Sequence, residues 1–376
     1  MIFETTRSTR TEYFITSSLL TEPALTQWRG RSIAVVVDRC LTRLHPQLWS
    51  PLLRLLAPEG VLDLEGGEKL KTTDSVERIL SFLSEMDMPK DGLVVAIGGG
   101  TICDAVSLAA TLFRRGVPLA LIPTTLLAQI DAAVGGKNGV NFGGTKNLLG
   151  HFYHPDSVIC DPSFLRTLRR REFVGGLAEA LKVLAVSEPH LFYRNTGCYD
   201  PSHIATRTED LAGLVADCLR SKLALLADDP YEVSSRRLLN YGHAFAHNFE
   251  EESGFSLSHG EAVLAGMTIE NAISCELNIA GPEVVTLQRV ITDLITPACR
   301  NHWIPRAQVS GLVSKLRAAR RGRLNLVCLR GIGDAEIFDD VDISVILAAW
   351  DRASDVVHNS DDLSAARQVA GTAMAK

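Results

Sequence analysis

The first 160 residues or so alternate short β-branched runs with segments of helical pattern, and this alternation limits the possible folds more than any other feature. The apolar runs are Ser32 to Asp38, Gly92 to Gly98 and Pro118 to Ile122. Such an order is typical of parallel strands joined by crossover helices. We therefore expect an α/β domain whose parallel sheet is flanked by helices.

The pattern changes near Pro162, where the strand signal fades. Long amphipathic segments follow at residues 172–186, 209–226, 234–253 and 261–278, and one apolar run at 324–329 resembles a strand. A chain of 376 residues favours two separate cores. We expect an α/β domain over residues 1–161, a mainly α-helical domain over 162–357, and a tail over 358–376 that frays.

Charge and composition exclude several classes of protein. The 38 Lys and Arg residues against 44 Asp and Glu give a net charge of −6, which argues against a nucleic-acid or anionic-membrane surface. The longest uncharged run, Gly116 to Ile130, is too short and too polar to cross a bilayer. Eight cysteines without any CxxC pair indicate buried thiols, and no secretory signal is visible. We expect a cytoplasmic protein.

Gly98, Gly99 and Gly100 follow directly on an apolar strand, and Asp104 comes four residues later in a predicted helix. A glycine-rich turn from strand to helix lets backbone amides approach a pyrophosphate. Cys103 stands where the dinucleotide fingerprint has its last glycine, so a tight turn without a ligand is an equal alternative. Asp38 ends another predicted strand. Its carboxylate is placed to accept hydrogen bonds from a ribose, or it serves only as the cap of the next helix.

The segment from Pro123 to Gly150 holds six glycines around three polar residues, Lys137, Lys146 and Asn147. Exposed amides and ammonium groups together predict a pocket for phosphate or for a polyhydroxylated substrate. A flexible surface loop is the alternative.

Glu179 and Lys182 are the only charges within residues 173–186. At i and i+3 they share one face of a predicted helix. A surface ion pair is one interpretation, but the apolar surroundings favour burial, which requires pairing or a metal.

A polar stripe runs along the segment 234–250. If it is one helix, the stripe carries Arg236, Asn240, His243 and His247. His259 follows a short loop and opens another predicted helix. Glu179, His243 and His259 then offer two imidazoles and a carboxylate, the ligand set of a catalytic zinc, although spacing alone does not bring them together.

Six motifs, GGGTICD, IPTTLLAQIDAAVGGKNGVN, GTKNLLGHFYHP, GLAEALK, RRLLNYGHAFAH and HGEAV, resemble those of dehydroquinate synthase and its relatives, the sugar phosphate cyclases. The resemblance covers about residues 65 to 340. It implies an N-terminal nucleotide-binding domain, a helical C-terminal domain, bound NAD, a divalent metal (zinc or cobalt) and a homodimer.

The resemblance also implies roles for individual residues. Matches to metal ligands are Glu179, His243 and His259, and matches to NAD contacts are Asp38, Glu68, Lys71, Gly99, Gly100, Asp104, Thr124 and Thr125. Matches to catalytic positions are Asp131, Lys137, Lys182, Lys222, Arg236, Asn240 and His247. Substrate or phosphate positions are Lys146, Asn147, Arg115 (which would reach a neighbouring subunit), and Arg320 and Arg321 in place of a late family lysine.

The activity implied is that of a carbon–oxygen lyase. It oxidises a phosphorylated ketose such as 3-deoxy-D-arabino-heptulosonate 7-phosphate, eliminates phosphate, reduces the intermediate again and closes a carbocycle by aldol addition. Arg236 and Lys222 would suit the substrate's carboxylate. Phe142-Gly143-Gly144-Thr145 departs from the family's His-Pro-Leu-Gly and is closer to cyclases of specialised metabolism (aminodehydroquinate, 2-epi-5-epi-valiolone or 2-deoxy-scyllo-inosose synthases). An NAD-dependent polyol dehydrogenase is the alternative from another class.

Overall fold

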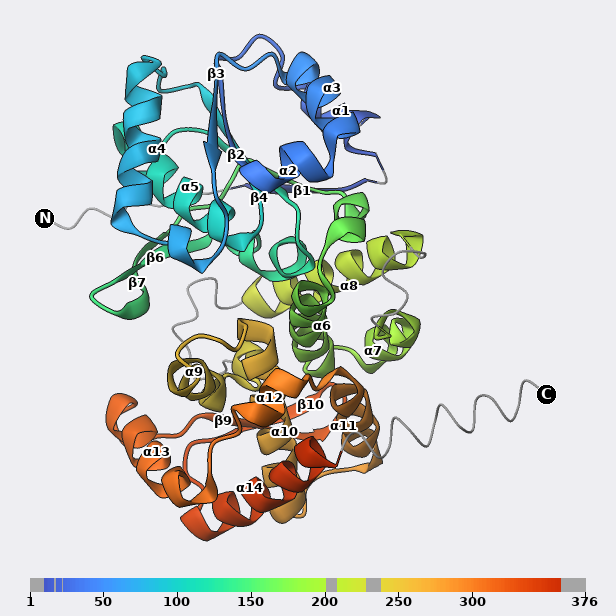
Figure 1. Cartoon of the computed structure of the whole chain (residues 1–376). Coiled ribbons are helices and arrows are strands. Elements are labelled where there is room, and N and C mark those ends of the chain that lie inside the picture. The colour runs from blue at the N-terminus through green and yellow to red at the C-terminus, as the bar shows by residue number, and fades with distance from the viewer. Residues whose placement is uncertain (1–9, 17, 22, 201–207, 228–237, 360–376) are drawn as a thin grey trace, which may run out of the picture. The chain divides into compact units, whose positions relative to one another are not determined.

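The chain divides into two compact units. The structure, a computed structural model, describes residues 10–16, 18–21, 23–200, 208–227 and 238–359 (Figure 1). The first unit comprises residues 1–169 with 204–219, and the second comprises 170–203 with 220–376. None of the described helices combines the length and apolar character needed to cross a membrane.

The first unit is built on a six-stranded sheet in the order β1-β8-β5-β4-β2-β3, and all its pairings are parallel. The strands are β1 (Glu12–Ile15), β2 (Ile33–Asp38), β3 (Gly60–Leu64), β4 (Leu93–Gly98), β5 (Leu119–Pro123) and β8 (Ser157–Cys160). The chain runs from β2 to its neighbour β3 and then returns to β4 on the other side of β2. The order therefore reverses between β2 and β4, which is where open parallel sheets bind ligands.

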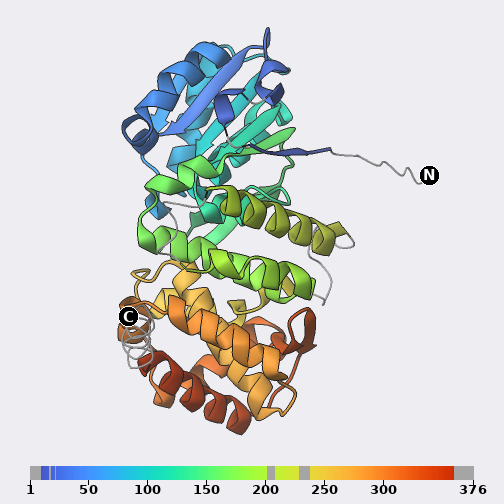
Figure 2. The same cartoon turned by 90° about the vertical axis from the view of Figure 1, so that its right-hand side faces the viewer.

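Helices cover both faces of this sheet, as Figure 2 shows from the side. They are α1 (Pro23–Thr26), α2 (Arg39–Leu44), α3 (Pro46–Leu56), α4 (Thr73–Glu85) and α5 (Gly100–Leu112). Val35 and Val37 of β2 pack into a core with Leu25, Leu41 and Leu52 from α1, α2 and α3. Ala34 and Val36, on the opposite face of β2, are equally buried. Burial on both faces explains the uninterrupted apolar runs seen in the sequence.

The glycine-rich segment forms an antiparallel hairpin, β6 (Lys137–Phe142) and β7 (Thr145–Phe152). Phe142 pairs with Thr145, and Gly143 and Gly144 between them have φ of 58° and 80°. Two consecutive positive φ values define the tight hairpin turn that suits a twisted pair of strands, and glycine adopts them without strain. The alternative of a flexible loop was wrong for this segment.

The second unit is mainly helical. Its helices are α6 (Arg170–Ala185), α7 (Pro189–Arg194), α9 (His243–Glu252), α10 (His259–Glu276), α11 (Pro282–Leu294), α12 (Pro297–Asn301), α13 (Arg306–Ala319) and α14 (Ile343–His358). Helix α8 (Thr208–Ala227) is divided between the units at Leu219. The expected late strand is β9 (Leu326–Gly331), which pairs with a second strand, β10 (Asp334–Phe338), that the sequence analysis missed.

Helix α10 is the centre of the second unit. It packs against α6, α9, α11, α12, α14 and β9 and is buried along most of its length. Two glycine contacts bring its neighbours close. A Cβ on Gly260 would lie 2.3 Å from Cα of Gly175 on α6, and a Cβ on Gly266 would lie 1.8 Å from the carbonyl oxygen of Gly242. Backbones can approach this closely only where side chains are absent.

Candidate functional site

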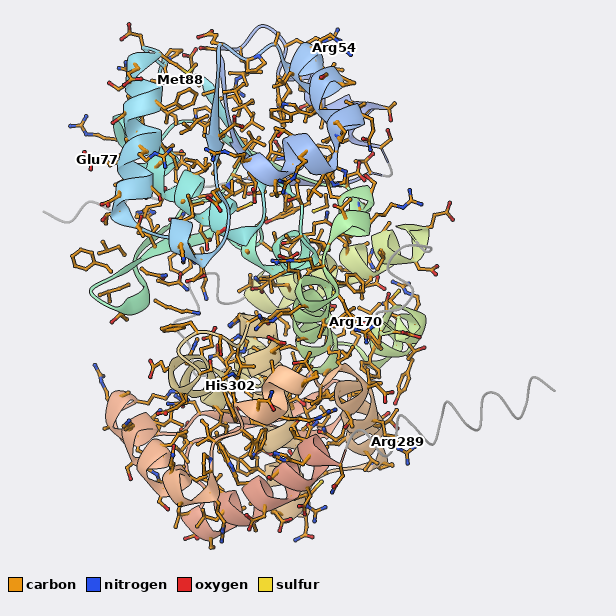
Figure 3. All side chains as sticks on the ribbon, in the orientation of Figure 1. Arg54, Glu77, Met88, Arg170, Arg289 and His302 are labelled. Atoms are coloured by element: carbon orange, nitrogen blue, oxygen red, sulfur yellow. The ribbon has the colours of Figure 1, made fainter. Side chains whose placement is uncertain are left out.

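Glu179, His243 and His259 converge in the second unit, although they lie on three helices. One ligand atom from each can be chosen so that all three lie within 4.8 Å of one another. Oε1 of Glu179 is 3.3 Å from Nε2 of His259 and 3.6 Å from Nε2 of His243. Glu179 is completely buried on α6, the helix that begins at Arg170, labelled in Figure 3.

These separations fit a metal ion. Ligand atoms about 2.0–2.2 Å from a tetrahedral zinc are about 3.3–3.6 Å apart, which matches the two distances measured here. Two imidazoles and a carboxylate form a ligand set that leaves a fourth position open. The predicted trio therefore fits a divalent cation.

The outer nitrogens of both imidazoles meet oxygen acceptors. Nδ1 of His243 lies 3.2 Å from the carbonyl oxygen of Tyr241, and Nδ1 of His259 lies 3.3 Å from Oε1 of Glu250. An oxygen that only accepts holds the proton on Nδ1 and leaves the lone pair of Nε2 for a metal. The second oxygen of Glu250 lies 3.1 Å from Nδ1 of His247.

The two histidines of the trio stand at the first positions of their helices. The proposed stripe from Arg236 to His247 on one continuous helix was wrong: Leu238–Asn240 forms a separate 3₁₀ turn, and Gly242 has φ of 80° before α9 begins at His243. That left-handed residue ends the preceding turn and redirects the chain. His259 opens α10, as predicted.

Each of these helix starts is held by a buried glutamate. Ser258 and Glu261 form a capping box at α10, and Glu261 also accepts hydrogen bonds from Nε of Arg171 and the hydroxyl of Thr296 at 2.8 and 2.7 Å. Gly242 has no side chain to cap α9. Its N–H donates instead to Oε2 of Glu270, from the middle of α10, at 2.8 Å.

Burial and neighbouring charges act differently on the three side chains of the cluster. Burial alone would raise the pKa of Glu179, but Lys182, whose Nζ is 2.5 Å from Oε2, and the two imidazoles hold it well below its usual range. Burial and the charge of Lys182 lower the pKa of His243 to about 3. Burial opposes the charged form of His259 too, yet Glu179 and Glu250 raise its pKa to about 10.

In the first unit, the predicted nucleotide-binding turn lies where β2 and β4 end. Gly98 ends β4, and α5 begins at Gly100 with Gly99 as its N-cap, without a side-chain hydrogen bond. Asp38 ends β2 and caps α2 by accepting from the N–H of Cys40. Thr124 and Thr125 follow β5, and a Cβ on Gly99 would lie 3.1 Å from Cγ2 of Thr125.

Three more of the predicted contacts form a network around Lys71. Its Nζ lies 2.6 Å from Oδ2 of Asp104 and 2.5 Å from Oδ1 of Asn147 on β7. Burial raises the pKa of Asp104 to about 6, even though Lys71 acts to lower it. Asn141, which the sequence analysis did not single out, donates to Oε1 of Glu68 at 2.8 Å. The hairpin is therefore tied to the Glu68–Leu70 turn.

The remaining predicted residues fall in separate places. Lys182 and Lys222 are buried in the second unit, where Asn240 is half-buried. Arg236 lies outside the described residues. Nη1 of Arg320 donates to the carbonyl of Leu324 at 2.5 Å, and Arg321 is exposed with φ of 55°. The first unit holds exposed Lys137 and Arg115 and half-buried Asp131 and Lys146.

Sequence reasoning missed Glu250, Glu270 and Tyr241. Glu250 lies seven residues after His243 and three after His247, a helical spacing that places it near both, and this signal could have found it. Glu270 acts on a different helix, and Tyr241 acts through its carbonyl oxygen. Neither contribution leaves a local trace in the sequence.

Comparison with known proteins matches both units to one family. The family model described as 3-dehydroquinate synthase N-terminal matches residues 61–175, and the C-terminal model matches residues 176–316. A 3-dehydroquinate synthase of Xanthomonas oryzae is 35% identical over 77% of this chain and 80% of its own. A 2-epi-valiolone synthase of Stigmatella aurantiaca is 34% identical over 86% of this chain and 82% of its own.

A solved structure shares the fold closely. It is the 2-epi-5-epi-valiolone synthase of Streptomyces hygroscopicus with NAD+ and Zn2+ bound, which superposes with a TM-score of 0.84 at 27% identity, over 94% of this chain and 99% of that one. The motifs, the fold and both family models agree. The chain belongs to the 3-dehydroquinate synthase family, the sugar phosphate cyclases.

Proposed function

We propose that this enzyme is a carbon–oxygen lyase of the 3-dehydroquinate synthase type, which converts a phosphorylated ketose into a carbocycle with release of phosphate. The observation that carries the proposal is the convergence of Glu179, His243 and His259 around a cation-sized space, with Lys182 beside them. When bound, a divalent metal (zinc or cobalt) would supply Lewis acidity to a substrate oxygen, and NAD would supply a reversible hydride acceptor.

Within this proposal, each unit has one task. The domain of residues 1–161 binds NAD, through Asp38, Glu68, Lys71, Gly99, Gly100, Asp104, Thr124 and Thr125. The reversal of strand order between β2 and β4 supports this assignment. The domain of residues 162–357 holds the metal and most substrate contacts. A bound NAD+ in the solved valiolone synthase supports the same cofactor here.

The chain's own side chains would position the substrate and move its protons. Lys182 and Lys222 are buried in the second unit. Lys222 and Arg236 are proposed to bind a carboxylate, and Asn240 and His247 the ring hydroxyls and their protons. Asp131 and Lys137 are proposed as the other catalytic residues. The proposed phosphate contacts are Lys146, Asn147 and Arg321. Arg320 is the weaker candidate because Leu324 engages its guanidinium.

A carboxylated substrate, 3-deoxy-D-arabino-heptulosonate 7-phosphate, is the first candidate. A specialised-metabolism cyclase acting on another sugar phosphate, such as a valiolone or deoxyinosose synthase, is the second. The likeness to 3-dehydroquinate synthases supports the first candidate, and the likeness to valiolone-type synthases supports the second. A homodimer in the cytoplasm, in which exposed Arg115 would reach the neighbouring subunit, completes the proposal.

A substrate panel tests the proposal. Zinc- or cobalt-loaded protein with NAD is given heptulosonate 7-phosphate, sedoheptulose 7-phosphate and glucose 6-phosphate in turn, and phosphate release is followed. Release from the heptulosonate alone supports the first candidate, and release from another sugar supports the second. No release from any of them would overturn the lyase proposal.

Two controls separate the proposal from its alternatives. A polyol dehydrogenase would accumulate NADH in proportion to the polyol consumed, whereas a cyclase that reuses its hydride would show none at steady state. Replacing His243 with Ala should abolish both bound metal and turnover. Metal retained at full stoichiometry in this variant would show that the ligand assignment is wrong.

A further inference from the structure

Glu250 on α9 is buried to 1% exposure and faces two imidazoles with its two oxygens. Oε1 lies 3.3 Å from Nδ1 of His259, and Oε2 lies 3.1 Å from Nδ1 of His247. The two rings have an interplanar angle of 27° and centroids 6.4 Å apart. One carboxylate therefore joins a proposed metal ligand to a histidine that is not one.

The chemistry of a carboxylate determines where the ring protons lie. Its oxygens accept hydrogen bonds and donate none, so each Nδ1 that faces Glu250 carries a proton. In a neutral ring, Nε2 is then the acceptor. For His259 that nitrogen faces Glu179. For His247, whose side chain is 59% exposed, Nε2 is the nitrogen left to take a proton.

We propose that Glu250 is a positioning residue that fixes the tautomers of His259 and His247 together, and so makes one a metal ligand and the other a proton acceptor. The inference rests on the proposed metal centre. His243 provides an internal reference, because the carbonyl of Tyr241, and not Glu250, faces its Nδ1.

Glu250→Gln is the informative variant. It keeps the size of the side chain but replaces one acceptor oxygen with an NH₂ donor, so it cannot accept from both rings. In the zinc-loaded protein we expect the amide oxygen to face His259 and the NH₂ group to face His247, which must then carry its proton on Nε2. The matched control is Glu251→Gln, the same change at an exposed neighbour on α9.

Two measurements compare the variants: zinc affinity and imidazole ¹⁵N chemical shifts. Zinc affinity, by competition with a chelator, should fall about 10–100-fold in Glu250→Gln and not in Glu251→Gln. Imidazole ¹⁵N chemical shifts, recorded where the rings are neutral and assigned with single-histidine variants, should show His247 changing from the Nδ1–H to the Nε2–H form. The His243 tautomer should stay unchanged.

The inference is overturned if wild-type His247 carries its proton on Nε2, or if Glu250→Gln matches Glu251→Gln in both measurements. The wild-type spectrum alone decides the point should Glu250→Gln fail to fold. Glu250→Asp, which keeps two acceptor oxygens, should retain the wild-type tautomer of His247. A wild-type protein that binds no zinc would instead refute the proposed metal centre, and the His247 tautomer would still test Glu250.

Discussion

Helices α9 and α10 both begin with an imidazole of the candidate centre, but their first turns are stabilised from different places. At α10 the cap is local, because Ser258 and Glu261 lie within one turn of His259. At α9 the N-cap is Gly242, and the carboxylate that accepts from its N–H comes from Glu270, 28 residues further along the chain. The α10 start can be recognised in sequence, whereas the α9 start depends on the folded unit.

The two glutamates that hold these helix starts, Glu261 and Glu270, also differ in how folding shifts their pKa. Burial acts to raise the pKa of Glu261, but Arg171, Ser258 and Thr296 outweigh it and lower the pKa. For Glu270, burial outweighs its backbone donors and raises the pKa to about 8. The two carboxylates that hold the ligand helices should therefore respond to pH in opposite directions, and four predictions test the comparison.

The largest effect is expected from Gly260→Ala, at the residue after His259. The new Cβ would lie 2.3 Å from Cα of Gly175, and backbone cannot yield as a flexible side chain can. We expect the free energy of unfolding to fall by more than about 3 kcal/mol, measured by urea denaturation. Gly311→Ala on α13, which has open space around it, should instead gain up to about 1 kcal/mol. Equal stabilities in the two variants would refute the close helix contact.

Glu261→Ala should have the next largest effect. It removes the acceptor for Arg171 and Thr296 as well as the capping box, at a cost of about 2–3 kcal/mol at pH 7. Because the pKa of Glu261 is lowered in the folded state, its contribution is present above its ordinary value of 4.5 and is lost as the pH falls through the lowered pKa. Urea titrations at several pH values would show the gap to wild type closing in acid. A gap that widens in acid would contradict the assignment.

Ser258→Ala isolates the local cap. The serine hydroxyl accepts from the N–H of Glu261, and its removal should cost about 1 kcal/mol. Thermal unfolding at neutral pH measures the loss. Ser314→Ala, at an exposed serine within α13, provides a control that should change stability little. Similar losses in both variants would show that the capping box contributes nothing specific.

Glu270→Gln should have the smallest effect at neutral pH, within about 1 kcal/mol, because an amide oxygen can still accept from Gly242. Its pH dependence is the test. The pKa of Glu270 is raised from 4.5 to about 8 by folding. Between pH 4.5 and about 8, this side chain is therefore protonated in the folded state and ionised in the unfolded state. The stability of the wild type relative to Glu270→Gln should therefore be greatest below pH 4.5, fall as the pH rises to about 8, and stay constant above. A rise over this window would contradict the assignment.

Much of the fold could be predicted because its signals are local. The apolar runs of β2, β4 and β5 are continuous because the sheet is buried on both faces. The hairpin was missed because the Gly143-Gly144 turn lies among many other glycines, which blur the alternation of strands. Strand β10 was missed because two of its five residues, Asp334 and Glu336, are charged and none of the five is fully buried.

The metal trio could be proposed from residue types together with a family resemblance, since three distant positions leave no common spacing. The error over the 236–247 stripe has one cause: Gly242 reads as a tolerated helix glycine, whereas contact with Gly266 and α10 requires its left-handed turn. Glu250 and Glu270 were overlooked because their partners are defined by helix packing. Residues that orient the candidate metal-binding side chains are therefore harder to predict from sequence than those side chains themselves.

The position of α10 bears on how the cluster would respond to thermal motion. Its first turn carries His259. Its middle contacts the start of α9, because Glu270 accepts a hydrogen bond from the N–H of Gly242 and Gly266 packs against Gly242. A shift of α10 within the second unit would thus bear on the positions of both imidazoles. The Gly175–Gly260 contact ties the same helix to α6, which carries Glu179, so the packing of one helix sets the mutual spacing of all three side chains.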